Sequence, residues 1–69
     1  MIVRINGKNE EVEKAATLLH LLESRGYYPQ RVVIEHNQHI IPQQDWQKVI
    51  LAENDNIEIV SFMAGGSDG

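Results

Sequence analysis

The apolar segment from residue 57 to residue 63 is the feature that most constrains this fold. Its length and hydrophobicity are typical of a strand in the centre of a sheet. The chain has 69 residues and no cysteine, so its single small core must form without disulfides. The residues before position 57 therefore have to supply both the neighbouring strands and the layer that covers them.

The first half of the chain predicts a hairpin followed by one helix. Residues 1–5 alternate apolar and polar side chains, and Asn-Gly at residues 6–7 is a strong hairpin signal because a type I′ turn needs positive φ at both positions. Residues 8–12 then return as a polar edge strand. Thr17 is a good N-cap for a helix with a leucine-rich stripe, and Gly26 ends that helix.

The second half predicts four segments before the last strand. They are a strand rich in β-branched residues, a shorter strand, one helical turn and an apolar stretch, at residues 31–36, 39–41, 43–46 and 49–51. Pro42 stops the shorter strand, and Trp46 is expected to anchor the core. A polar turn at residues 53–56 leads into the last strand.

This order of elements predicts an α+β domain, in which one main helix covers the inner face of a mixed sheet. The residues expected to supply most of the core are Val3, Ile5, Leu18, Leu19, Leu22, Val32, Ile34, Trp46, Ile57 and Ile59. Residues 1–63 would form the folded domain and residues 64–69 a flexible glycine-rich tail.

The tail consists almost entirely of small residues. Glycine lacks a Cβ, so the Ala-Gly-Gly at residues 64–66 can pass through a channel too narrow for other residues. Fully extended, these residues reach about 10 Å. The tail is therefore either a frayed terminus or the working part of the chain.

The last strand also predicts a docking surface. If Ile57 and Ile59 point inward, Val60 and Phe62 point outward. An exposed aromatic side chain beside a flexible chain end often marks a protein-binding surface. We expect partners to dock on Val60, Phe62, Met63, Ala64, Gly65 and Gly66. A register slip would instead bury Phe62.

The composition argues against several function classes. A formal net charge of −4 disfavours nucleic acid or an anionic membrane as the main partner. No apolar run approaches transmembrane length, and residues 1–5 are too short and too alternating for a signal peptide. We therefore expect a cytoplasmic protein.

Few side chains suggest catalysis or metal binding. The sequence has no Ser-His-Asp arrangement and no phosphate-binding loop, so we expect that the chain is not an enzyme and binds no cofactor. His20, His36 and His39 lack further ligands at suitable spacing, so no metal site is expected. The acidic residues at 10, 11 and 13 suit a solvated edge strand, or the steering of a basic partner.

The run from Asn37 to Trp46 carries the most specific resemblance. It reads Asn-Gln-His-Ile-Ile-Pro-Gln-Gln-Asp-Trp, which is similar to the Asn-x-x-(Ile/Val)-(Ile/Val)-Pro-x-x-x-Trp pattern of the thiamine-biosynthesis sulfur carriers (ThiS type). Further matches in the family's order and spacing are Ile5-Asn6-Gly7, Thr17–Leu22, Asp55 and Gly65-Gly66. The resemblance covers residues 1–66 and implies a ubiquitin-like β-grasp fold. The related molybdopterin-synthase small subunit fits the Pro42–Trp46 segment less well.

The resemblance implies that Gly66 carries sulfur. An E1-like adenylyltransferase would use ATP and Mg²⁺ to convert the Gly66 carboxylate to an acyl-adenylate. A sulfur-donating persulfide protein would then displace AMP, and the resulting thiocarboxylate would pass to thiazole synthase. The carrier would act by holding its tail in position on a rigid body.

Ser67-Asp68-Gly69 depart from the family pattern, which ends at Gly-Gly. In this sequence Gly66 carries an amide where adenylation needs a carboxylate. We favour removal of these residues by a trimming protease. The alternatives are that carrier chemistry has been lost, or that Gly69 is itself activated. Other functions also stay open: a sulfur carrier for molybdopterin or an amino acid, or a non-catalytic β-grasp interaction module.

Overall fold

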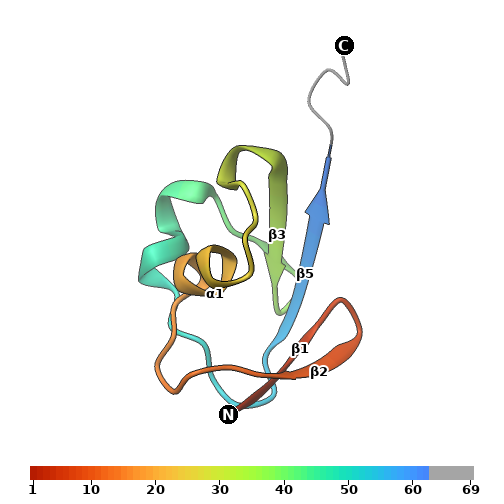
Figure 1. Cartoon of the computed structure of the whole chain (residues 1–69), viewed down its shortest axis with the longest axis vertical. Coiled ribbons are helices and arrows are strands. Elements are labelled where there is room, and N and C mark those ends of the chain that lie inside the picture. The colour runs from red at the N-terminus through yellow and green to blue at the C-terminus, as the bar shows by residue number, and fades with distance from the viewer. Residues whose placement is uncertain (63–69) are drawn as a thin grey trace.

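The computed structural model of the chain describes residues 1–62, and in it one helix packs on a five-stranded mixed sheet (Figure 1). The strands are β1 (Ile2–Ile5), β2 (Lys8–Glu11), β3 (Val32–His36), β4 (His39–Ile40) and β5 (Asn56–Ser61). The helices are α1 (Leu18–Ser24) and two 3-10 helices, η1 (Pro29–Arg31) and η2 (Gln43–Lys48). The sheet order is β2-β1-β5-β3-β4, so the predicted α+β fold with the last strand at its centre is confirmed.

The turns and caps form where the sequence predicts them. Asn6 and Gly7 have φ of 50° and 83°, which the hairpin between β1 and β2 requires. Thr17 Oγ1 accepts a hydrogen bond from the His20 N–H at 3.1 Å and caps α1, and Gly26 follows the helix with φ of 77°. The helix α1 has seven residues, and none of the helices in residues 1–62 has the length and hydrophobicity to cross a membrane.

The core lies between α1 and the inner face of the sheet. Every predicted core residue is buried except Leu19, which is only partly buried at the edge of the core. The prediction for Leu19 was wrong because α1 turns the i, i+3 and i+4 positions Leu18, Leu21 and Leu22 toward the sheet. Ala16, Leu21 and Leu51 complete the core and were not in the predicted list.

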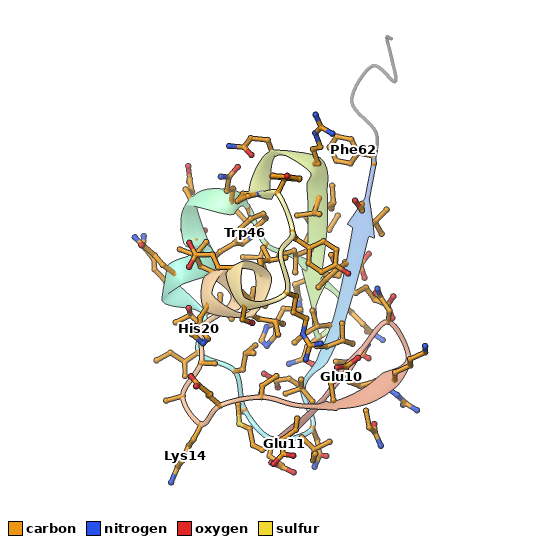
Figure 2. All side chains as sticks on the ribbon, viewed as in Figure 1. Glu10, Glu11, Lys14, His20, Trp46 and Phe62 are labelled. Atoms are coloured by element: carbon orange, nitrogen blue, oxygen red, sulfur yellow. The ribbon has the colours of Figure 1, made fainter. Side chains whose placement is uncertain are left out.

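Trp46 anchors the core as predicted, with 2% of its surface exposed. Its indole Nε1–H donates to the Ile41 carbonyl at 2.8 Å, so the polar end of the buried ring is satisfied. Trp46 lies on η2, which extends to Lys48 and is longer than the single turn expected for residues 43–46. Figure 2 shows Trp46 between the helical layer and the sheet.

Candidate functional site

An exposed apolar strip runs along β3 and β5 on the outer face of the sheet, away from α1. Val33 and Val60 are directly opposite each other in the pairing of these strands, and they are 40% and 59% exposed. Phe62 follows the end of β5 and is 46% exposed. Val60 and Phe62 therefore point outward as predicted, and the register slip that would bury Phe62 does not occur. We call Val33, Val60 and Phe62 the apolar strip.

The backbone is anchored as far as the end of the apolar strip. The Phe62 N–H donates to the Arg31 carbonyl at 2.8 Å, and the Arg31 guanidinium lies over the Tyr28 ring at 5.8 Å from its centroid. Figure 2 shows Phe62 at the opposite end of β5 from the hairpin that carries Glu10 and Glu11. The other predicted docking residues, Met63, Ala64, Gly65 and Gly66, lie outside the described residues, as do the predicted tail and its boundary.

The Asn6 side chain supports β5 beyond the point where β1 ends. Pairing between the parallel strands stops at Ile5 and Ile57. Asn6 then continues the ladder with its amide: the Ile59 N–H donates to Asn6 Oδ1 at 2.8 Å, and Asn6 Nδ2 donates to the Ile59 carbonyl at 3.2 Å. The sequence predicted Asn6 only as a turn residue, so this second role was missed.

Asp55 holds the start of β5 against the turn between β3 and β4. Asp55 Oδ2 accepts from His36 Nε2 and from the Ala52 N–H, both at 2.8 Å, and Oδ1 accepts from Asn37 Nδ2 at 3.1 Å. Burial raises the pKa of Asp55, but the hydrogen bonds from His36, Ala52 and Asn37 and the charge of His36 outweigh it, so that pKa lies below its usual value. The sequence placed Asp55 in a polar turn but did not predict this network.

The described residues show little that could hold a cofactor or a metal. Within residues 1–62, no three His, Cys, Asp or Glu side chains lie close enough together to bind a metal ion. His20 Nε2 lies 3.2 Å from Glu13 Oε1, and His36 is engaged with Asp55. A hollow of about 160 Å³ beside α1, lined in part by Glu13, His20 and Arg25, is smaller than typical ligand pockets. A second hollow, of about 500 Å³, is wide open to solvent and is lined by Leu19, Gln43, Gln44 and Gln47.

Comparison with known proteins assigns the family. The model of the ThiS family matches residues 3–66. The chain belongs to the ThiS family. It is 35% identical over 66 residues to the sulfur carrier protein ThiS of Bacillus subtilis, a match that covers 94% of this chain and 100% of that protein. The B. subtilis relative is a sulfur carrier protein, so the predicted resemblance to the ThiS-type carriers is confirmed.

Two further similarities bear on this ThiS-family chain. It is 35% identical over 66 residues to a thiazole synthase of Magnetococcus marinus, a match that covers 96% of this chain but 20% of that protein. The chain thus spans about a fifth of that relative's length. Its structure resembles the crystal structure of the thiamine biosynthesis protein ThiS from Geobacter metallireducens, with a TM-score of 0.81, 21% identity and coverage of 91% and 96% of the two chains. This likeness confirms the β-grasp fold.

Proposed function

We propose that this ThiS-family chain carries sulfur as a thiocarboxylate on Gly66 and donates it for thiazole formation. The observation that carries the proposal is the apolar strip, which ends at Phe62, three residues before Gly65-Gly66 in the sequence. A surface for docking and a thin chain end are the two parts that a carrier needs. The chemical groups for activating and transferring sulfur then come from its partners.

The first step activates the Gly66 carboxylate. A carboxylate is a poor acyl donor because it is a resonance-stabilised anion. An E1-like adenylyltransferase with ATP and Mg²⁺ forms the Gly66 acyl-adenylate and releases pyrophosphate. The carrier contributes position: docking of the rigid body presents one carboxylate to the active site at high effective concentration.

The second step introduces sulfur. The terminal sulfur of a protein persulfide attacks the Gly66 acyl carbon, and AMP leaves with the electrons of the broken C–O bond. This gives an acyl disulfide, and a thiol cleaves its S–S bond to release the Gly66 thiocarboxylate and a new disulfide. Thiazole synthase then accepts the sulfur.

The partner thiazole synthase is supported by the M. marinus relative, a thiazole synthase with a region similar to this chain. Where a carrier region and an acceptor enzyme share one polypeptide, the linkage raises the effective concentration of one toward the other. We propose that the apolar strip provides the surface on which thiazole synthase docks.

The chemistry requires a free carboxylate on Gly66. Since Ser67-Asp68-Gly69 follow Gly66, we propose that a protease removes these residues before activation. Activation of Gly69 is less suitable because Asp68 would bring a charged side chain into a channel suited to glycine.

Mass spectrometry of the protein from its native cells tests the proposal. We expect a species that ends at Gly66, and a chain truncated there should exchange one oxygen for sulfur when incubated with the adenylyltransferase, ATP and a persulfide donor. Gly66→Ala in the truncated chain should fold normally but resist adenylation, because its methyl group obstructs the channel. Detection of the full-length chain alone in cells, with no adenylation of either form, would contradict the carrier function and favour an interaction module.

A further inference from the structure

Two carboxylates lie directly opposite each other on the outer face of the sheet. Glu35 on β3 and Glu58 on β5 are paired in register, and both are partly buried. Like charges at such positions destabilise a sheet. Neither carboxylate forms an ion pair with a cation of residues 1–62, and residues 63–69 contain no Lys, Arg or His. The free protein therefore leaves these two like charges without an ion-pair partner among the described residues.

Apolar side chains border this charge pair. Val33 and Val60 of the apolar strip form the next cross-strand pair on the outer face toward the end of β5, and Ile40 on β4, 66% exposed, lies opposite Glu35. β3 and β5 run side by side in Figure 1. A partner protein that covered the apolar strip would also shield Glu35 and Glu58 from water. Shielding strengthens the interaction of these carboxylates with a cation of the partner. The partner would have to supply such a cation, because burying unpaired charges is costly.

We propose that Glu35 and Glu58 together bind one arginine of the thiazole synthase that receives the sulfur, an inference that rests on the proposed function. A planar guanidinium has five N–H donors and can bridge two carboxylates, whereas a lysine ammonium is a single point charge. Cβ atoms of directly opposite residues are about 5 Å apart, a spacing that one guanidinium can span. The net charge of −4 also favours a partner with a basic docking surface.

The position of the charge pair gives it a role in orientation. Glu58 lies four residues before Phe62, about 13 Å along the strand at roughly 3.3 Å per residue. An apolar contact at the strip alone permits sliding and rotation. A charge-assisted contact at this distance sets one orientation of the carrier, and so directs its glycine tail toward one entry point.

Binding of the full chain to the thiazole synthase of the same organism tests the inference, with Kd measured by isothermal titration calorimetry. We expect Glu35→Gln and Glu58→Gln each to weaken binding about tenfold, which corresponds to about 1.4 kcal/mol. The double variant should lose less than the product of the single effects, because both carboxylates contact the same guanidinium. Glu23→Gln is the matched control: it removes the same charge from an exposed position on α1 and should leave Kd unchanged.

Thermal unfolding of the free variants gives a second readout. Since each substitution removes a repulsion, both Glu35→Gln and Glu58→Gln should raise Tm while they weaken binding. A purely structural role for these residues would move Tm and affinity in the same direction.

Three results would overturn the inference: no binding of the wild-type chain to thiazole synthase, variants that bind like Glu23→Gln, or single effects that multiply fully in the double variant. The inference would also be overturned if Glu35→Gln and Glu58→Gln weakened binding to the adenylyltransferase but not to thiazole synthase, because the arginine would then belong to the adenylyltransferase. Failure of the proposed function is seen separately, as the absence of a thiocarboxylate on a chain that ends at Gly66.

Discussion

Asn6→Gly removes the amide that holds Ile59 and leaves the turn unstrained, because glycine readily adopts the φ of 50° found at this position. Ile59 is 6% exposed and lies in the central strand, so its backbone N–H and carbonyl lose their partners in a largely buried place. We expect the hairpin to form normally and the far half of β5 to be held less tightly on its β1 side.

The expected loss of stability follows from the two hydrogen bonds. Each contributes about 1 kcal/mol net, so Asn6→Gly should lower the free energy of unfolding by about 2 kcal/mol. For a domain of this size, that corresponds to a fall in Tm of about 8–16 °C. Asn6→Ala should cost about 1 kcal/mol more, because alanine is also strained at positive φ.

Urea unfolding at pH 7, followed by the fluorescence of the single tryptophan, Trp46, measures this loss. Asn54→Gly is the control: Asn54 also has positive φ, at 70°, but its side chain makes no hydrogen bond within residues 1–62. This control should be neutral or slightly stabilising. If Asn6→Gly and Asn54→Gly agree within about 0.5 kcal/mol, the amide does not support β5 and the reasoning is refuted.

Other substitutions test the rest of the structure. Asp55→Asn should cost about 1–3 kcal/mol at pH 7, since the donors around Asp55 lose their carboxylate. Because the pKa of Asp55 is lowered in the folded protein, the wild type should lose this advantage as the pH falls below about 4, and urea titrations of the two proteins should converge there. Trp46→Phe should cost about 1–3 kcal/mol in thermal melts followed by circular dichroism, because the Ile41 carbonyl loses its donor. Phe62→Asp should change Tm by less than about 4 °C yet abolish capture of the adenylyltransferase on immobilised carrier; a large fall in Tm would show that Phe62 supports the core.

Local patterns in the sequence predicted much of the fold and part of the site. The Asn-Gly turn, the Thr17 cap and Gly26 are local signals, since each acts on the backbone within a few residues of itself. Val60 and Phe62 could be placed on the outer face because side chains alternate along any strand. The resemblance to the ThiS family added the β-grasp fold and the proposed role of the tail, which no local pattern contains.

Contacts between distant segments could not be predicted in this way. Asn6 and Ile59 are 53 residues apart, and His36 and Asp55 are 19 residues apart, so nothing near either residue in the sequence indicates its partner. The sequence by itself determined which segments become strands, which faces they bury and where the glycine-rich stretch begins, because these depend on local geometry and side-chain periodicity. Only the tertiary structure decided that β5 is supported by the Asn6 amide and that Glu35 faces Glu58, because the register of strand pairing is a property of the whole sheet.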